Sequence, residues 1–283
     1  MSDKFSVKEF TNLLPFLQSH LQTWARNKIK QRLQTGCVSV NGVTTTQHNH
    51  PLKPDDLVEI GAAQKSPNEV SSHLEILYSD RDLIAINKPA GLLSVGNTKE
   101  TQQHALAILR RQLSRRSQEL KLWPVHRIDR DTSGVLLFAT SREIREAVMA
   151  KWDQAEKTYL AVVEGNPSPD HGTIEQPLRL DEVQYRVHVG EHPDAKLAIT
   201  HFKTLKTTPK RALLEVNIDT GKQHQIRAHL AWLGYPVVGD ERYGRSGERM
   251  GLHSLRLKII QPNSGKELTF ESPAPANFMR LII

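Results

Sequence analysis

A polar stretch that contains a proline divides the sequence into two segments, each with its own apolar periodicity. Residues 62–70 read Ala-Ala-Gln-Lys-Ser-Pro-Asn-Glu-Val, a composition typical of a linker. A chain of 283 residues is long enough for a small domain and a larger one, each with its own core. We therefore predict a small domain over 1–61, a linker over 62–70 and a larger domain over 71–283.

Composition indicates a globular protein whose partner is a polyanion. No apolar run approaches the roughly 18 residues that cross a bilayer, so no membrane partner is expected. Cys37 is the only cysteine, which excludes an intramolecular disulfide and a Cys-x-x-Cys metal site and fits a reducing, cytoplasmic setting. The formal charge of +7 and the pI near 9.5 favour nucleic acid, although an ordinary basic protein has the same balance.

Apolar residues at helical spacing predict two short helices in the first segment. The first helix carries Leu13, Leu14, Phe16, Leu17 and Leu21. Ile29 and Leu33 belong to the second, which is expected to end at Gly36. A strand running into an Asn-Gly turn at Asn41 follows, and then a turn and a strand over 54–60.

Four basic residues lie on or beside the second helix with no acidic residue between them: Arg26, Lys28, Lys30 and Arg32. Such a run on its own is as often a solvated helix face. The whole order of helices, Val-x-Val-Asn-Gly and Pro-Asp-Asp-Leu-Val resembles the S4 RNA-binding module over residues 10–60. The resemblance implies that the four residues contact RNA. That family usually has Gly-Asp in its last turn, where this chain has Asp55-Asp56.

The second segment begins with strands and then alternates strands with helices. Two strands are predicted over 74–87, a helix over 105–113, and a buried strand over 135–139. Ser141 is expected to cap a helix that continues to about residue 152. A strand over 159–163, further strands over 198–218 and a helix over 225–233 complete the prediction.

The densest group of polar residues is His126-Arg-Ile-Asp-Arg-Asp-Thr-Ser-Gly, a loop directly before the predicted buried strand. Polar side chains on a loop anchored by a rigid strand are a common active-site arrangement, and a surface turn with salt bridges is the alternative. A serine hydrolase would use His126, Asp129 and Ser133, but the Gly-x-Ser-x-Gly sequence around such a nucleophile is missing.

A second polar group, Gly221-Lys-Gln-His-Gln-Ile-Arg, opens the last predicted helix. His224 and His229 are five residues apart and so do not share one helix face as a zinc pair would. We predict no metal site here. Arg227 is the useful group, since it can pair with a carboxylate elsewhere and keep that carboxylate ionised.

Five motifs follow one another along the second segment. They are Ile84-Ala-Ile-Asn-Lys-Pro-Ala-Gly-Leu, the His126 motif above, Lys157-Thr-Tyr-Leu-Ala-Val-Val-Glu-Gly, the Gly221 motif, and Val237-Val-Gly-Asp-Glu-Arg-Tyr-Gly. Together, and in this order, they closely resemble the RluA-type pseudouridine synthases. The resemblance covers residue 74 to the end. It implies an isomerase that converts uridine to pseudouridine in RNA without a cofactor. Ribosomal RNA of the large subunit is the favoured substrate, and transfer RNA stays open.

The resemblance also implies the fold: an α+β protein in which an S4-like module precedes a mixed, largely antiparallel sheet with flanking helices. It places the catalytic carboxylate at Asp129, and not at Asp131, either as a nucleophile or as an aid to glycosidic cleavage. Tyr159 would stack on the uracil and help to remove the C5 proton, and Arg227 would pair with Asp129.

Four further residues of these motifs are expected to contact the substrate: Arg127, Ile226, His126 and Lys88. Ile226 would lie against the uracil, and Arg127 would fill the space that the flipped base leaves. The usual family motif reads Gly-Arg-Thr-His-Gln-Ile-Arg, whereas Lys222 and Gln223 stand here. The replacement leaves Arg227 intact and bears only on the local phosphate or backbone contacts that the family motif would make.

Several alternatives stay open. Arg110, Arg111, Arg115 and Arg116 extend a basic track across the site or form a solvated helix face. Methylation of uridine at C5 is disfavoured because Cys37 lies in the first segment and no Gly-x-Gly-x-x-Gly loop occurs. A ribosome-assembly protein that has lost the chemistry would be free to lose Asp129, Tyr159 or Arg227. A monomer is the default expectation.

Overall fold

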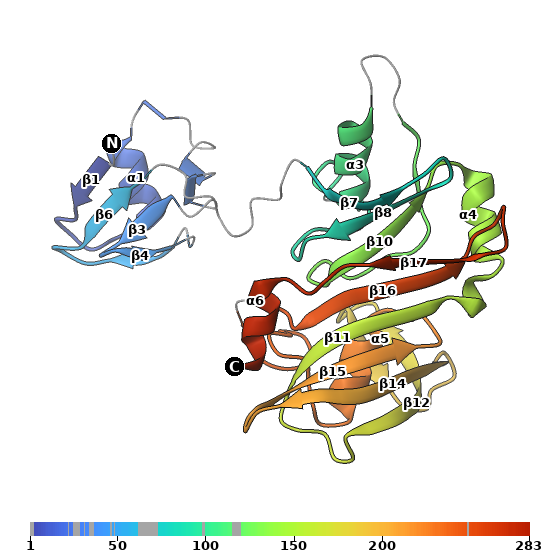
Figure 1. Cartoon of the computed structure of the whole chain (residues 1–283). Coiled ribbons are helices and arrows are strands. Elements are labelled where there is room, and N and C mark those ends of the chain that lie inside the picture. The colour runs from blue at the N-terminus through green and yellow to red at the C-terminus, as the bar shows by residue number, and fades with distance from the viewer. Residues whose placement is uncertain are drawn as a thin grey trace. The chain divides into compact units, whose positions relative to one another are not determined.

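The structure of the chain is a computed structural model that describes residues 3–21, 23–24, 29–30, 32–33, 37–45, 47, 49–61, 73–97, 100–114, 120–247 and 249–283. It divides into two compact units, Met1–Glu69 and Val70–Ile283 (Figure 1). The predicted linker over 62–70 lies outside the described residues. None of the described helices is long and apolar enough to cross a membrane.

The first unit is a small antiparallel sheet with helices packed on it. The strand order is β1 (Asp3–Ser6), β6 (Leu57–Ile60), β3 (Val38–Val40) and β4 (Val43–Thr44). A separate pair joins β2 (Thr11–Asn12) to β5 (Pro51–Leu52), directly before α1 (Leu13–His20). The apolar spacing of α1 buries Leu13 and Leu17 in one core with Ile29 and Leu33. The described residues around Ile29 and Leu33 are helical, as predicted, whereas the predicted end at Gly36 lies outside the description.

Two tight turns of the first unit use left-handed backbone. Asn41 and Gly42 have φ values of 51° and 80° and join β3 to β4, as the Asn-Gly pair predicts. Asp55 has a φ of 69°, at the position where the S4 pattern usually has glycine. The Asp56 carboxylate accepts hydrogen bonds from the Lys53 amide at 2.7 Å and the Asn41 side chain at 2.9 Å. Side-chain bonding therefore holds this turn with a non-glycine residue in left-handed backbone.

The second unit is built on one eleven-stranded sheet. Its strand order is β13 (Arg186–Val189), β12 (His171–Asp181), β14 (Lys196–Thr207), β15 (Arg211–Ile218), β11 (Glu156–Glu164), β16 (Leu252–Ile260), β10 (Ser133–Ala139), β8 (Leu83–Lys88) and β7 (Glu75–Ser79). Two strands lie off this path, β17 (Glu267–Glu271) beside β16 and β9 (Trp123–Pro124) beside β10. All of these pairs are antiparallel except β10 with β16, which confirms the predicted mixed, largely antiparallel sheet.

The parallel pair places the polar loop 126–132 at the middle of the sheet. Ser133 lies opposite His253 and Gly134 opposite Ser254. A Cβ on Gly134 would stand 2.1 Å from the Ser254 carbonyl oxygen, and its φ is +108°, so only glycine fits there. All seven residues of β10 are buried, which gives the loop a rigid strand to end on.

Helices cover both faces of this sheet. Helix α3 (Ala105–Leu113) buries its apolar side against β8 and β10. Ser141 caps α4 (Arg142–Met149) by accepting from the Ile144 amide, as predicted, but the helix ends before residue 152 and a 3-10 turn, Trp152–Gln154, follows.

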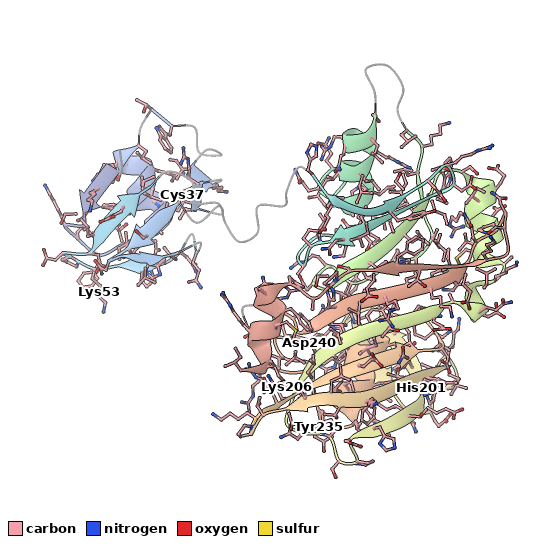
Figure 2. All side chains as sticks on the ribbon, viewed as in Figure 1. Cys37, Lys53, His201, Lys206, Tyr235 and Asp240 are labelled. Atoms are coloured by element: carbon pink, nitrogen blue, oxygen red, sulfur yellow. The ribbon has the colours of Figure 1, made fainter. Side chains whose placement is uncertain are left out.

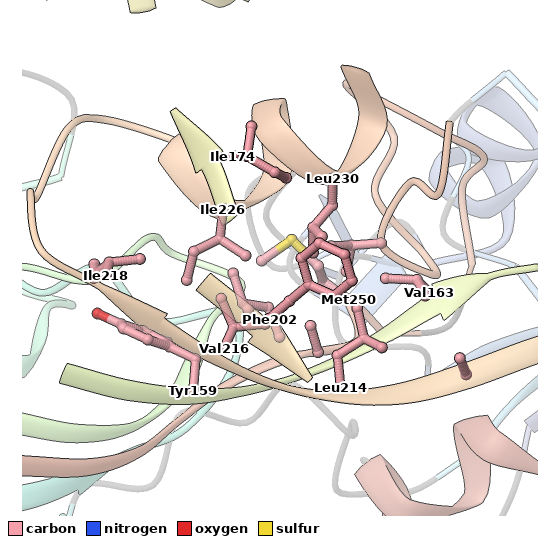
Figure 3. Close-up of a cluster of buried hydrophobic side chains, with 14 of the residues drawn as sticks. Tyr159, Val163, Ile174, Phe202, Leu214, Val216, Ile218, Ile226, Leu230 and Met250 are labelled. Atoms are coloured by element: carbon pink, nitrogen blue, oxygen red, sulfur yellow. The ribbon is translucent and has the colours of Figure 1, made fainter. Parts of the chain in front are cut away.

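Strand β11 shows how the two faces are filled. Its alternate residues Tyr159, Ala161 and Val163 share a core with α5 (Gln225–Trp232), whose Ile226 and Leu230 point at the sheet in Figure 3. Leu160 and Val162 belong to another core, with residues of α6 (Ala276–Met279) and the 3-10 turn Arg280–Ile282. A strand buried on both sides reads as the continuous apolar run seen in the sequence.

Candidate active site

The loop that carries Asp129 is fixed by hydrogen bonds on both sides of that residue. The Ser94 hydroxyl donates to the Ile128 carbonyl at 2.7 Å and accepts from the Ile128 amide at 3.2 Å. The Thr132 amide donates to the Asp129 carbonyl at 3.2 Å. The Asp129 side chain is 26% exposed, so a substrate can reach it.

Arg227 reaches Asp129 from the first turn of α5. Its Nη1 lies 2.8 Å from Asp129 Oδ2. Its Nε and Nη2 donate to the two carboxylate oxygens of Asp240 at 2.6 and 2.8 Å, a bidentate pair that fixes the plane of the guanidinium. Asp240, labelled in Figure 2, is buried and also accepts from the backbone amides of Arg242 and Tyr243. Arg227 is thus held in place before it meets Asp129.

The charges of this group stabilise one another. Burial alone would lower the pKa of Arg227, but the carboxylates of Asp240 and Asp129 raise it above its ordinary value. Burial alone would raise the pKa of Asp240, yet the hydrogen bonds and the charge of Arg227 hold it below the usual range. Both groups therefore stay ionised, and Arg227 presents a permanent cation to Asp129.

Tyr243 and His224 complete this side of the site, and the sequence assigned a role to neither. The Tyr243 ring centre lies 5.2 Å from the guanidinium carbon of Arg227. The Tyr243 hydroxyl accepts from the Val187 amide at 2.8 Å and hydrogen-bonds His224 Nδ1 at 3.0 Å. His224 has a φ of 51°, a left-handed conformation that a residue without a special role rarely adopts. That positive φ has no signal in the sequence.

An apolar wall lies beside the carboxylate. Tyr159 from β11, Ile226 from α5 and Ile128 next to Asp129 belong to one buried cluster, and Figure 3 shows Tyr159 and Ile226 on facing elements. Burial, together with the charge of Asp129, raises the pKa of Tyr159 to about 12, against a small opposing effect of a hydrogen bond with Ser254. The phenol is therefore neutral at physiological pH. A neutral aromatic ring and an aliphatic side chain suit the face of a planar base.

Lys88 lies inside the protein instead of at the surface of the site. Its side chain is fully buried, and Nζ donates to the carbonyls of Pro89 at 3.0 Å, Leu92 at 2.6 Å and Arg130 at 2.9 Å. Burial lowers its pKa to about 7, although the charges of Asp131 and Asp129 act in the opposite direction. The expected contact with substrate is therefore replaced by contacts with the backbone of the loop.

His126 also packs into the protein. Its Nε2 accepts a hydrogen bond from the Leu137 amide at 3.2 Å, and its ring centre lies 5.5 Å from that of Trp152. Burial lowers the pKa of His126 to about 4, and the charge of Lys157 adds to the effect. A neutral ring with one nitrogen already bonded to β10 supports the loop from beneath.

The remaining basic residues are divided between exposed positions and local contacts. Arg127 is exposed next to the loop. Arg110 donates to the Leu122 carbonyl at 2.7 Å and Arg111 to the Gln102 carbonyl at 3.2 Å, whereas Arg115 and Arg116 lie outside the described residues. The structure therefore gives Arg110 and Arg111 local contacts.

In the first unit, the structure describes two of the four basic residues. Arg32 donates to the Gly61 carbonyl at 3.3 Å and lies 5.6 Å from the centre of the Trp24 ring. Lys30 is half-buried on the same helical stretch, and Arg26 and Lys28 lie outside the described residues.

Ser133 cannot act as a hydrolase nucleophile. It is 3% exposed, and its Oγ lies 2.8 Å from Nδ1 of His253 instead of binding His126. A substrate has no access to a hydroxyl buried between two strands. Within the described ranges, no group of three or more His, Cys, Asp or Glu residues is placed to hold a metal ion.

Comparisons with known proteins show what this chain is similar to. Residues 82–232 match the family model described as RNA pseudouridylate synthase. An uncharacterized RNA pseudouridine synthase of Bacillus subtilis is 32% identical over 94% of this chain and 91% of its own length. Ribosomal large subunit pseudouridine synthase D of Zymomonas mobilis is 30% identical over 94% of this chain and 90% of its own. The solved structure of human RNA pseudouridylate synthase domain containing 4 is 25% identical, with a TM-score of 0.60 over 73% of this chain and 91% of that one.

Proposed function

This chain belongs to the RluA-type family of RNA pseudouridylate synthases, and on that premise we propose that Asp129, Arg227 and Tyr159 carry out its reaction. The chain is an enzyme that converts uridine in RNA to pseudouridine. The observation that supports the assignment is one carboxylate, Asp129, that is both partly exposed and fixed by a buried cation. A neutral apolar wall stands beside that carboxylate.

The reaction breaks the bond between N1 of uracil and C1′ of ribose, and the electron pair of that bond stays with the base. The detached uracil turns and bonds to C1′ through C5, which then loses its proton, and N1 gains one. Asp129 acts at C1′ or C6, as a nucleophile or by assisting cleavage. Arg227 keeps the carboxylate at a fixed position, so the reacting atoms need no reorganisation.

Tyr159 and Ile226 hold the base while it turns. Both side chains belong to one apolar cluster, and the planar uracil can rotate against such a surface because it forms no hydrogen bonds with it. Because the pKa of Tyr159 is raised to about 12, it meets the base as a neutral phenol. Its hydroxyl therefore assists loss of the C5 proton in a concerted transfer, in which it takes the proton from C5 while its own proton passes to water, and it does not act as a standing phenolate.

The first unit is assigned to RNA binding as an S4-like module. A basic helical stretch, the Asn-Gly hairpin and the turn at Asp55 support this assignment. Large-subunit ribosomal RNA is the proposed substrate because two relatives are named ribosomal large subunit pseudouridine synthase D, one in Zymomonas mobilis and one in Nitrosomonas europaea, matched over 90% and 80% of their own length. A substrate of this kind agrees with the cytoplasmic setting that the single cysteine predicts.

Pseudouridine mapping of total RNA tests the function and names the substrate. A strain without the gene is complemented with the wild type, Asp129→Asn or Asp131→Asn. Asparagine keeps the size of the side chain and removes its charge. Asp131, two residues along the same loop, pairs with Arg130 at 3.3 Å, both side chains being at least half exposed.

We expect the wild type and Asp131→Asn to restore a site that Asp129→Asn leaves as uridine. Restoration by Asp129→Asn would remove the catalytic role of that residue. If no site is lost on deletion of the gene while ribosome assembly suffers, the protein is an assembly factor that has kept the fold.

A further inference from the structure

We infer that Arg249 is a positioning residue for Asp129. It bonds Ser133, at the end of the loop that carries Asp129, and links that loop to the C-terminal helix α6. The inference rests on the proposed role of Asp129. Arg249 donates to the Ser133 hydroxyl through Nη2 and to the Asn277 side chain through Nη1. Its guanidinium carbon lies 5.4 Å from the centre of the Phe278 ring.

The hydrogen bonds of this cluster have only one consistent set of directions. His253 Nε2 lies 2.7 Å from the Ser272 carbonyl, which can only accept, so Nε2 carries the proton. Burial, with a smaller contribution from the charge of Arg249, lowers the pKa of His253 against the effect of the Ser272 bond, so the ring is neutral. Nδ1 then accepts from the Ser133 hydroxyl, whose oxygen accepts from Arg249.

The cluster stands where the catalytic loop ends. Ser133 is the first residue of β10 and lies opposite His253 in the parallel register, four residues after Asp129. Before Ser133 in the chain, the loop is held by Ser94, which bonds Ile128, and by Lys88, which bonds Arg130. Arg249 supplies the hold on the downstream side. A loop fixed at three points keeps the carboxylate in one position.

The polarity of Arg249 is costly for a purely structural side chain. It is partly buried, burial lowers its pKa, and none of the ion pairs within the described part of the chain includes it. Its Nε is buried without a hydrogen-bond acceptor. A partly buried guanidinium that leaves one donor without an acceptor is unfavourable. Of its two side-chain acceptors, Ser133 and Asn277, only Ser133 adjoins the catalytic loop, and that contact is the one to which we assign a function.

The second guanidinium nitrogen, Nη1, connects Arg249 to the C-terminal helix α6 through Asn277. Phe278 is fully buried in one core with Leu160 and Val162 of β11, the strand that also carries Tyr159. Helix α6 is thereby anchored to the central sheet, and Asn277 and Phe278 offer Arg249 a fixed surface. Arg249 therefore links α6 to the end of the catalytic loop through its bonds with Asn277 and Ser133.

The test compares Arg249→Met with Arg245→Met, an exposed arginine of the same segment. The substrate is total RNA labelled with 5-tritiated uridine from a strain that lacks the gene, and tritium release is followed with enzyme in excess. We expect Arg249→Met to slow the single-turnover rate about 10- to 100-fold, the effect of a misplaced reacting group. The Kd for the RNA should stay within about twofold, and Arg245→Met should match the wild type in both measurements.

Asn277→Ala removes one bond of the cluster, and Ser133→Ala removes two, those with Arg249 and with His253. Both variants cover the case in which Arg249→Met does not fold. Ser133→Ala should slow the rate, and combining it with Arg249→Met should add little, because both remove the same contact. Equal rates for Arg249→Met and Arg245→Met, or a loss confined to RNA affinity, would overturn the inference. Full activity of Asp129→Asn would instead overturn the proposed function.

Discussion

At the scale of single residues, His126 shows how a site can depend on a side chain that faces away from it. The ring is neutral because burial lowers its pKa to about 4, whereas the same histidine in an unfolded chain has an ordinary pKa of 6.5. Between these two values the unfolded chain binds a proton that the folded chain does not. Stability is therefore fully present above about pH 6.5 and is lost as the pH falls through 4.

We predict that His126→Gln flattens this dependence, since glutamine does not titrate and its carbonyl can still accept from the Leu137 amide. The free energy of unfolding, measured with urea at pH 7 and pH 4.5, should fall by roughly 2 kcal/mol less in the variant than in the wild type. His192→Gln is the control, because His192 is exposed. Parallel curves for the wild type and His126→Gln would show that this ring titrates normally.

Individual roles could be predicted from sequence only where they depend on chemistry and not on burial. The residues alone predicted that Arg227 would pair with a carboxylate, the family resemblance predicted that this carboxylate would be Asp129, and the pair is observed. Lys88 was expected at the surface of the site, whereas the structure buries it with its Nζ on backbone carbonyls, one of them that of Arg130, 42 residues along the chain. The sequence does not show a contact between residues so far apart. Asp240 belongs to the Val237 motif, but the sequence predicted no role for it, because its burial depends on how α5 packs.

At the scale of elements, the ion pair between Arg227 and Asp240 joins α5 to the turn that follows Val237. It is the bidentate bond that aims the third guanidinium donor at Asp129. We predict that Asp240→Asn leaves the cation only partly compensated and costs about 3 kcal/mol of stability. Tritium release should slow as well, because Arg227 can then turn away from Asp129.

The measurement is urea unfolding at pH 7, with Glu241→Gln, an exposed neighbour, as the matched control. Because Arg227 holds the pKa of Asp240 below its usual 3.8, this stabilisation is present above that value and is lost only as the pH falls through the lowered one. The gap between the wild type and Asp240→Asn should therefore be full at pH 7 and shrink in strong acid. A variant as stable as Glu241→Gln would show that the pair is dispensable.

Elements were predictable where burial is dense. Strand β10 and helices α3 and α5 appear at the predicted places because each has a continuous or periodic apolar pattern. Strand β12 was not predicted, since among its eleven residues only Ile174 and Leu178 are buried, and residues four apart do not show strand alternation. Its partners β13 and β14 define it instead, and sequence does not show pairing of that kind.

At the scale of the whole molecule, the two units have separate cores, so each can be assigned its own task. The proposed chemistry lies entirely in the second unit. The first unit contributes basic residues, and a polyanion bound by basic side chains releases counterions in proportion to the phosphates that are neutralised. The salt dependence of RNA binding therefore reports on the first unit, and the reaction rate at saturating enzyme reports on the second.

We predict that deleting residues 1–61 weakens binding of the target RNA about tenfold or more near 0.15 M KCl and reduces the slope of log Kd against log salt, because phosphate contacts are lost. The rate with enzyme in excess should stay within about threefold, since Asp129, Arg227 and Tyr159 are untouched. In the full chain, changing Arg26, Lys28 and Lys30 together to Ala should reproduce the lower slope, whereas changing Lys8 and Lys53 should not. An unchanged slope after the deletion would mean that the first unit does not contact phosphates. If the second unit alone is folded but inactive, the first unit forms part of the active site.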